Sequence, residues 1–362
     1  MDISKIDKNF VIEQVDRTDL EWHEITESAF SVHGVFFDEA ADCYVRMPQE
    51  IAQTVSEGVH YLSRQTAGGR VRFATDSPYV AIRCTAPVDF PMHHMTLTGS
   101  RGVALYADNV FHGSFIFGGD VLINAHRKGA ETLTFDSIRD FKDEKLRECS
   151  LYLPLYGSVK KLLVGLKKGC ILQAAKPYTH SRPVVFYGSS ITQGGCASQS
   201  GNDYISHLSR WLDFDFINLG FSGNAKAEPQ IAEYLAGLNA SVFVLDYDHN
   251  APDLAHLEKT HFPLYARIRK SHANAPVVLM TKPDFDRDPV LNAKCRSVVY
   301  DTYYKAKAQG DENIYFIDGE TLFGSFDRHA CTVDTCHPND LGFYRMAQTV
   351  RPVLEKIFQK LD

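Results

Sequence analysis

The stretch PVVFYGSSITQGG, residues 183–195, decides the fold of the second half of this 362-residue chain. A run of apolar residues ends at Gly188, and two serines, Ser189 and Ser190, follow at once. Such a run predicts a strand that is buried on both faces, and the polar turn after it predicts the start of a helix. Either one of the serines carries chemistry, or both only cap the helix.

The same pattern repeats downstream, where four further apolar runs alternate with helical segments. Strands that are apolar throughout and are separated by helices are typical of a parallel sheet between two helix layers. The sequence therefore predicts a three-layer α/β domain with a five-stranded parallel sheet. The expected strands are residues 183–188, 214–220, 241–247, 276–282 and 313–319, and the expected helices are residues 202–213, 228–238, 253–272, 288–309 and 339–360.

Residues before about 175 have a different character. Short segments with alternating apolar and polar residues are separated by Gly, Asp, Ser and Pro at intervals of about ten residues, which is typical of a β-sandwich or jelly roll. A Pro-bracketed polar stretch, KPYTHSRP (176–183), is the predicted linker, so the expected domains are 1–177 and 178–362. The expected strands are residues 70–76, 79–86, 103–108, 111–119, 131–136, 149–156 and 159–166, and the one expected helix is residues 48–65.

Charge and composition exclude some classes of partner. The net charge is −7, which disfavours a protein that binds nucleic acid or an anionic membrane surface, because both need a positive face. No apolar run approaches the roughly 18 residues that a membrane span needs. The first residues, MDISKIDKNFVIEQV, lack the apolar region of a signal peptide, so we expect a cytoplasmic protein. Composition does not set the oligomeric state, and a homo-oligomer stays open.

Polar loops follow the predicted strands at the edge of the sheet where ligands usually bind. They are GSSITQGG (188–195), GFSGN (220–224), DYDHN (246–250) and, just before the last helix, DTCHPND (334–340). Together they supply a serine, a glycine turn, an asparagine and an Asp/His pair, which are the parts of an acyl-transfer site. The serine loop matches neither a Walker A loop, nor G-x-G-x-x-G, nor the G-x-S-x-G elbow.

These four loops, in this order, resemble the four sequence blocks of the SGNH (GDSL-type) hydrolases. The resemblance covers residues 180–360, and it implies a flavodoxin-like domain. Upstream, GVALY (102–106) is similar to the GxDLY-type segment of a subgroup with an N-terminal β-sandwich, whose arrangement is similar to that of carbohydrate acetylesterases. Two positions depart from the family pattern: Ser189 replaces the usual aspartate, and Asp-His-Asn at 248–250 replaces Gly-x-Asn-Asp.

The resemblance implies a catalytic triad. Ser190 is the expected nucleophile; it follows the end of a strand and begins a helix whose dipole favours a developing anion. His337 is the expected base, and Asp334 is expected to orient it, since a spacing of three residues in a turn brings a carboxylate to an imidazole. The alternative for a lone histidine is a packed or solvated side chain.

The resemblance also implies three oxyanion donors, the backbone N–H groups of Ser190 and Gly223 and the side-chain amide of Asn250. Gly220 is the near alternative to Gly223, and Gly223 could also be a simple turn glycine with positive φ. Asn250 could instead form a cap or an Asx turn before Pro252.

No cofactor or metal is expected. Asp246, Asp248 and His249 crowd one loop and raise the hypothesis of a cation site, but we favour local hydrogen bonds that hold Asn250, because the mechanism needs no metal. The eight cysteines form no CxxC pair and are expected to be reduced thiols without a zinc site. His93 and His94 lie on a predicted strand, where they would point to opposite faces.

The sequence thus predicts a serine esterase that hydrolyses carboxylic esters, with an acetyl or other short acyl group on a carbohydrate as the expected substrate. A lipid or general short-chain ester is the alternative within this class. Two alternatives come from other classes: a non-catalytic carbohydrate-binding protein with a vestigial hydrolase domain, and a doubly wound domain that binds phosphate or flavin.

Overall fold

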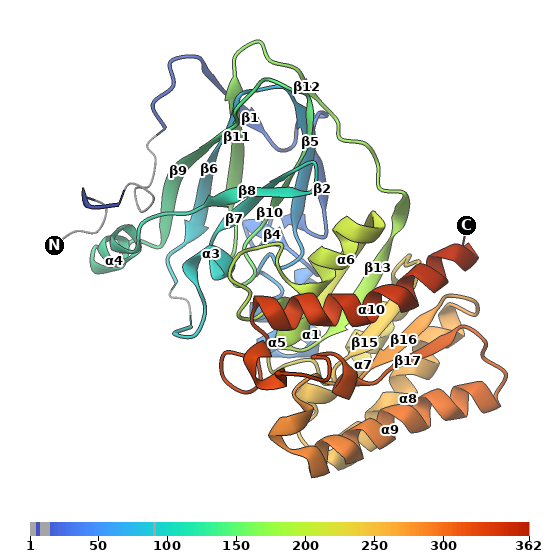
Figure 1. Cartoon of the computed structure of the whole chain (residues 1–362). Coiled ribbons are helices and arrows are strands. Elements are labelled where there is room, and N and C mark those ends of the chain that lie inside the picture. The colour runs from blue at the N-terminus through green and yellow to red at the C-terminus, as the bar shows by residue number, and fades with distance from the viewer. Residues whose placement is uncertain (1–4, 8–14, 90–91, 362) are drawn as a thin grey trace.

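The structure is a computed structural model that describes residues 5–7, 15–89 and 92–361. It has an upper part built mostly of antiparallel strands and a lower part in which helices flank a parallel sheet (Figure 1). This is the two-part architecture that the sequence predicts, and it places the loops after the parallel strands close to the end of the upper part.

The upper part contains two large antiparallel sheets that share one core, and a small two-stranded sheet. The elements over residues 20–173 are β1 (Leu20–Glu24), β2 (Ser31–His33), β3 (Phe36–Asp38), β4 (Cys43–Val45), α1 (Gln49–Val55), α2 (Glu57–Leu62), β5 (Arg70–Thr75), β6 (Tyr79–Pro87), α3 (Leu97–Ser100), β7 (Val103–Ala107), β8 (Val110–Phe115), α4 (Gly119–Arg127), β9 (Thr132–Asp140), β10 (Arg147–Tyr152), β11 (Lys161–Lys167) and β12 (Leu172–Gln173), and all but α1 and α2 belong to the upper part. One sheet has the order β1-β11-β6-β9 and the other β12-β5-β10-β7-β8, with β2 also paired to β5. Inward residues such as Ile82 and Val164 from the first sheet and Phe73 and Leu151 from the second pack in one buried core, as in a β-sandwich.

The lower part contains the predicted five-stranded parallel sheet, with the order β14-β13-β15-β16-β17. In chain order this is 2-1-3-4-5, the arrangement of flavodoxin-like folds. Its elements are β13 (His180–Gly188), α5 (Ser190–Gln193), α6 (Tyr204–Leu212), β14 (Phe214–Gly220), α7 (Pro229–Gly237), β15 (Val242–Asp246), α8 (Leu254–Ser271), β16 (Val277–Met280), α9 (Pro289–Ala308), β17 (Ile314–Ile317) and α10 (Asp340–Leu361), with short 3₁₀ turns at Asp248–Asn250, Phe285–Arg287, Gly319–Thr321 and Arg328–Cys331.

Both faces of this sheet are buried, which explains why its strands are apolar throughout. Along β13, Val184 and Phe186 point to the layer formed by α6 and α10, and Val185 and Tyr187 point to the layer formed by α7, α8 and α9. Successive side chains of a strand alternate between faces, so each face receives half of the apolar run. Figure 1 shows α6 and α10 on the near side of the sheet.

The predicted helix over residues 48–65 is wrong in its extent, because the chain forms two short helices there. Ser56 has an extended backbone (φ −170°) that interrupts the helix, and its side chain caps α2 by accepting a hydrogen bond from the backbone N–H of Val59. The predicted strand 111–119 ends at Phe115, and α4 follows it. The run GDVLINAHR of α4 places apolar side chains at positions three apart, a helical pattern that the prediction overlooked.

The two helices near the start of the chain belong to the core of the lower part. Met47, Ala52, Val59 and Leu62 pack in the same buried cluster as Tyr187 and the helices α7 and α8. The early segment therefore completes one helix layer over the parallel sheet. The domain boundary at 177 stays a prediction, as does a jelly-roll connectivity of the upper sheets.

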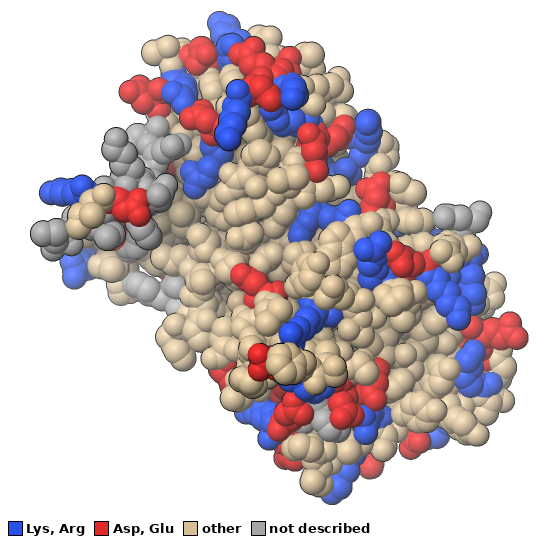
Figure 2. Space-filling view, viewed as in Figure 1, with Lys and Arg blue, Asp and Glu red and all other residues tan. Residues whose placement is uncertain are grey.

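Surface charge is mixed. Acidic and basic side chains are interspersed over the face shown in Figure 2, without a large patch of one sign. Within the described part of the chain, no helix combines the length and the apolar character needed to cross a bilayer.

Candidate active site

Ser190 stands just after the carboxyl end of β13, which lies between β14 and β15 in the sheet, and it is the first residue of α5. The backbone before it is tightly packed: a Cβ on Gly188 would lie 2.1 Å from Thr192 Oγ1 and 2.3 Å from the carbonyl oxygen of Asp246, so only glycine fits there. Ser189 is the N-cap, and its hydroxyl accepts a hydrogen bond of 3.1 Å from the backbone N–H of Ile191. Ser189 therefore supplies the capping oxygen that an aspartate would supply at this position.

The structure brings Ser190, His337 and Asp334 into one chain of hydrogen bonds. Ser190 Oγ lies 2.9 Å from His337 Nε2, and His337 Nδ1 lies 2.7 Å from Asp334 Oδ2. Ser190 is 6% exposed, whereas the side chain of His337 is 21% exposed, so the pair lies at an accessible edge of the sheet. Ser190 and His337 are 147 positions apart in the sequence, and the fold of the parallel sheet brings their loops together.

The short loop before α10 fixes the carboxylate. Asp334 Oδ1 accepts hydrogen bonds from the backbone N–H groups of His337 (2.7 Å) and Cys336 (3.1 Å), while Oδ2 faces the imidazole. Burial alone would raise the pKa of Asp334, but the hydrogen bonds from the His337 side chain and from these backbone groups hold that pKa below its usual value. Asp334 is thus kept ionised beside the imidazole, which favours an imidazolium when His337 takes up a proton.

The three backbone N–H groups considered as oxyanion donors, those of Ser190, Gly220 and Gly223, differ in whether they are engaged. Gly220 donates its N–H to Asn218 Oδ1 at 2.9 Å. Among the described residues, the N–H groups of Ser190 and Gly223 have no hydrogen-bond acceptor. Gly223 has a positive φ of 69°, and nothing lies within 4 Å of the position that its Cβ would occupy. Its peptide group therefore borders open space.

Asn250 lies beside the glycine loop and is tied to it. Its Nδ2 donates to the carbonyl oxygen of Phe221 at 2.9 Å, and the N–H of Phe221 donates to the carbonyl oxygen of Gly188 at 2.8 Å. These two hydrogen bonds form a ladder that connects three segments: the loop after β15, the loop after β14 and the turn before Ser190. A carboxamide has two N–H groups, so one remains for an oxyanion.

Two glutamines that the sequence analysis did not single out support the glycine loop. Gln193 is fully buried in α5, and its Oε1 accepts a hydrogen bond from the backbone N–H of Ser222 at 3.1 Å. Its Nε2 donates to Gln65 Oε1 at 2.6 Å, and Gln65 comes from the turn after α2. The residue next to Gly223 is thus held through a contact between the two parts of the molecule.

Arg46 is a second support that sequence patterns do not reveal. It is 1% exposed, and its guanidinium donates to the carbonyl oxygens of Gln65, Leu62, Asn218 and Gly220 at 2.7–2.9 Å. Burial lowers its pKa to about 9. Since two of these carbonyls end β14, Arg46 fixes the strand from which the glycine loop departs.

Three buried carboxylates surround the loop after β15. Thr192 Oγ1 donates to Asp246 Oδ2 at 3.0 Å, and the backbone N–H of Lys282 donates to Asp248 Oδ2 at 3.3 Å. Burial raises the pKa of Asp246 well above its usual value and raises that of Asp248 to about 6. The third carboxylate, Asp284, lies near His249. The expected local hydrogen bonds therefore exist, but they hold Thr192 and Lys282 rather than Asn250.

The predicted placement of His93 and His94 on a strand is wrong. They lie in a turn before α3, and their rings are 5.0 Å apart. The ring of His94 also lies 5.5 Å from that of His337. The upper part therefore contributes an imidazole to the edge of the site, because a turn, unlike a strand, can direct two neighbouring side chains to the same side.

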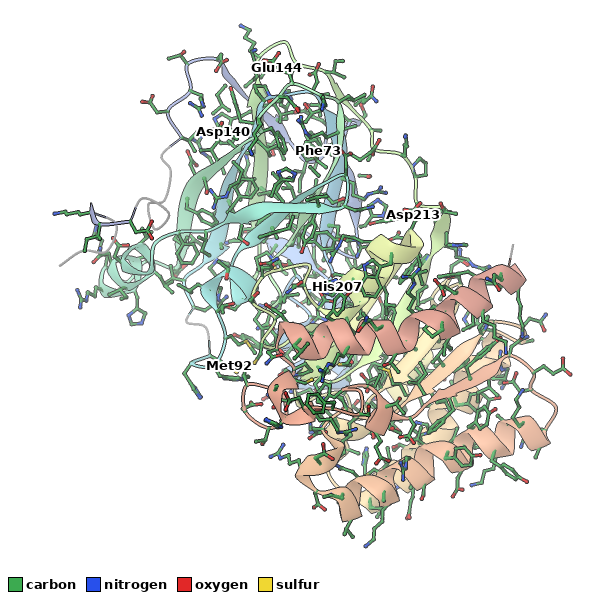
Figure 3. All side chains as sticks on the ribbon, viewed as in Figure 1. Phe73, Met92, Asp140, Glu144, His207 and Asp213 are labelled. Carbon is green, nitrogen blue, oxygen red and sulfur yellow. The ribbon has the colours of Figure 1, made fainter. Side chains whose placement is uncertain are left out.

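A cavity of about 290 Å³ borders the glycine loop, on the side of the upper part. Figure 3 shows Met92, which lines it, at the end of the upper part nearest the lower loops. Tyr156, another lining residue, donates its hydroxyl to the carbonyl oxygen of Ser190 at 3.3 Å. The residues that line this cavity are Gly58, Tyr61, Leu62, Gln65, Met92, Arg101, Tyr156, Ser222 and Asn224.

Comparison with known families gives this geometry its context. Residues 181–355 match the model of the GDSL-like lipase/acylhydrolase family, and residues 20–172 match that of the N-terminus of SGNH-hydrolase-type esterases, called GxDLY. The chain belongs to the SGNH (GDSL-type) hydrolases. It is accordingly a carboxylic ester hydrolase. A comparison with curated proteins finds no match.

Solved structures of similar shape extend over both parts of this SGNH hydrolase. A GDSL-like lipase from Bacteroides ovatus is 26% identical, with 94% of this chain and 98% of that chain covered and a TM-score of 0.81. The salicylyl-acyltransferase SsfX3 from a tetracycline biosynthetic pathway is 19% identical, with 95% and 99% covered and a TM-score of 0.76. An acetyl xylan esterase from the rumen bacterium Butyrivibrio proteoclasticus is 14% identical, with 95% and 100% covered and a TM-score of 0.60.

The last two likenesses show the fold alone. The predicted SGNH fold with an antiparallel N-terminal part is thus confirmed. The cytoplasmic location stays a prediction, and the oligomeric state stays open.

Proposed function

We propose that this SGNH hydrolase removes acetyl or other short acyl groups from carbohydrate esters, with Ser190, His337 and Asp334 as its triad. The observation that carries the proposal is the unbroken hydrogen-bond chain from Ser190 Oγ through both nitrogens of His337 to Asp334. A serine hydroxyl is a weak nucleophile until a base takes its proton, and His337 Nε2 is within reach to do so.

In the proposed mechanism, Ser190 Oγ attacks the acyl carbon while its proton passes to His337 Nε2. The imidazolium then protonates the leaving alcohol oxygen, and an acyl-serine ester remains. Water, deprotonated by the same imidazole, attacks this ester; the bond to Ser190 Oγ breaks, the imidazolium returns its proton to that oxygen, and the carboxylic acid leaves. Asp334 holds the Nδ1–H tautomer and stabilises the imidazolium throughout.

The tetrahedral intermediates carry a negative oxygen, for which we assign three donors. They are the N–H groups of Ser190 and Gly223 and the Nδ2 amide of Asn250. Support for this set comes from the two unengaged N–H groups and from the ladder that holds Asn250 against the glycine loop. One such donor typically contributes about 10²–10³-fold to turnover.

Support for a short acyl group and a carbohydrate alcohol is less direct. The cavity of about 290 Å³ beside the glycine loop is small for a ligand site, and Tyr61, Arg101 and Ser222 give it polar groups. A long alkyl chain needs a longer apolar channel. The shared architecture with an acetyl xylan esterase is consistent with this substrate class.

A panel of esters tests the substrate. We expect the highest kcat/KM for acetyl among chromogenic esters from acetyl to octanoyl, and release of acetate from acetylated oligosaccharides. A preference for octanoyl esters, with no release from saccharides, would instead identify a lipid or general ester hydrolase.

Two neighbouring serines provide a matched pair for testing the triad. Ser190→Ala should abolish turnover and labelling by a fluorophosphonate. Ser189→Ala should remove only the cap, at a cost of about 1 kcal/mol in stability, and should keep the label. Turnover that persists in Ser190→Ala would refute the assignment.

A further inference from the structure

The side chains of His249, Asp284 and Cys336 lie close together, next to the loop that carries Asp334 and His337, and the proposed mechanism uses none of them. His249 Nε2 lies 2.9 Å from Cys336 Sγ and 3.8 Å from Asp284 Oδ2. One potential ligand atom from each of the three residues lies within 4.8 Å of the other two. They come from three loops, after β15, after β16 and before α10, so the cluster exists only in the folded chain.

The carboxylate of this cluster is buried without adequate compensation. Asp284 is 5% exposed, and its Oδ1 has no hydrogen-bond partner among the described residues. The neighbouring Asp248 is 3% exposed and also has an unpartnered Oδ1. The nearest guanidinium nitrogen, from Arg287, is 4.0 Å from Asp284 Oδ2, and the Arg287 side chain is 54% exposed, so it offsets little of this charge.

Buried carboxylates that lack a partner are costly, and a cation is one way to remove the cost. An imidazole nitrogen, a thiolate and a carboxylate are each ligand types that zinc accepts. Zinc binds such atoms at about 2.0–2.3 Å, which separates tetrahedral donors by roughly 3.3–3.6 Å. The observed separations of 2.9 and 3.8 Å bracket that range, so side-chain shifts of well under ~1 Å would suffice.

We propose that His249, Asp284 and Cys336 bind one zinc-type divalent cation that ties together the three loops behind the triad. The thiol proton of Cys336 leaves to solvent on binding, and no group changes oxidation state. A fourth position is open to water from a cavity of about 200 Å³ that Asp284, Arg287 and Thr335 help to line. The cation is structural: it is not a reactant in ester hydrolysis, and it holds the segment that carries His337.

A second group of potential ligands lies nearby and must be distinguished in any test. His94, Cys196 and His337 also place one donor atom each within 4.8 Å of one another. A cation there would occupy the imidazole that Ser190 needs. These two groups differ in their cysteine, so a cysteine-specific signal separates them. A third group, Asp334, Cys336 and His337, shares Cys336 with the proposed site, and the loss of affinity in His249→Gln and Asp284→Asn separates the two.

The test uses the full chain after treatment with a chelator. Titration with Zn²⁺ should show one equivalent bound and a higher Tm, and Co²⁺ should give the near-ultraviolet absorption band of a thiolate–cobalt bond. In Cys336→Ser that band should vanish, and in both Cys336→Ser and His249→Gln the affinity should fall by about 100-fold or more. Cys331→Ser, five residues earlier, and Cys196→Ser should keep both the band and the affinity.

Three outcomes would overturn the proposal. The first is a wild-type chain that binds no Zn²⁺ at micromolar concentration. The second is a thiolate band lost in Cys196→Ser and kept in Cys336→Ser, which would place the cation at the triad. The third is unchanged affinity in Asp284→Asn and His249→Gln, two variants that keep the thiol and serve if Cys336→Ser does not fold.

Discussion

Ser189 and Ser190 are adjacent serines with different environments. The hydroxyl of Ser189 accepts a hydrogen bond from the backbone N–H of Ile191 and caps the start of α5, whereas that of Ser190 lies within hydrogen-bond distance of His337 in the loop before α10. The side chain that replaces the usual aspartate of the family therefore keeps its capping role. At the scale of single residues, the departure from the family pattern leaves the contact between Ser190 and His337 in place.

The carboxylate of Asp334 gives a sharp prediction at this scale. Asp334→Asn keeps the shape of the loop but cannot stabilise an imidazolium, so we expect kcat on an acetyl ester to fall by up to about 10⁴-fold with little change in KM. Steady-state kinetics with circular dichroism as a folding control measures this. A fall of less than tenfold would mean that His337 works without its partner.

His261 gives a prediction about pH. Complete burial lowers its pKa to about 3, and its Nδ1 lies 2.8 Å from the Thr302 hydroxyl. In the unfolded chain this imidazole takes up a proton near pH 6.5, whereas in the folded chain it stays neutral down to about pH 3. The unfolded state therefore binds more protons between these values, and the free energy of unfolding decreases as pH falls from about 6.5 towards 3.

The variant His261→Gln lacks that proton, and it should lose less stability than the wild type on acidification. The slope difference should approach about 1.4 kcal/mol for each pH unit below 6. Urea unfolding at pH 7, 6, 5 and 4 measures it. Parallel pH profiles for the two proteins would contradict the prediction.

At the scale of elements, the loop after β14 separates two glycines by their surroundings. A Cβ on Gly220 would lie 2.2 Å from the backbone nitrogen of Gln193, whereas a Cβ on Gly223 would meet nothing. Gly220→Ala should therefore displace α5, with a loss of both stability and activity. Gly223→Ala keeps its N–H and should cost about 1 kcal/mol through its positive φ, with most of kcat kept. Thermal unfolding and kcat are measured for both variants. A greater loss of Tm and kcat in Gly223→Ala than in Gly220→Ala would show that Gly223 is the packed position.

Arg46 links β4 and α1 to the end of β14, and its planar fork meets four carbonyl oxygens. The ammonium group of a lysine is a single point donor and cannot reach all four, so Arg46→Lys would leave buried carbonyls unpaired. We expect destabilisation by about 2–4 kcal/mol, and a larger fall in kcat than in 1/KM. Chemical denaturation and kinetics at a permissive temperature measure both. If Arg46→Lys were as stable as the wild type, water would be replacing the lost guanidinium hydrogen bonds.

The predictable elements are those whose signal is local. The apolar runs of the parallel strands, the polar loops after them and the Asp334-x-x-His337 spacing are each contiguous in the chain, so the sheet and the candidate triad can be predicted from sequence. Arg46 and Gln193 cannot, because their partners lie up to 174 residues away and no pattern joins them. The same holds for Asp284, whose relation to Cys336 arises only when two loops meet.

At the scale of the whole molecule, the two parts share a core. Met47, Val59 and Leu62 from the early segment are buried against the same sheet face as α7 and α8. A chain of residues 178–362 alone would expose this apolar face to water, at about 25 cal/mol for each Å² uncovered. We expect it to be aggregated or molten, with far-ultraviolet circular dichroism but no cooperative thermal transition. A soluble fragment with wild-type kcat would refute the shared core.

The shared core also determines where natural or engineered recombination can succeed. A chimera joined at the Pro-bracketed stretch, residues 176–183, would pair a new sandwich with a hydrolase that still requires Arg46 and Gln65 as partners of Gly220 and Gln193. Recombination between homologues should therefore give folded chimeras only when the segment from β4 to the turn after α2 and the hydrolase part come from the same parent. The residues that must be inherited together then come from both sides of the predicted linker, because the segment from β4 to the turn after α2 belongs with the hydrolase part.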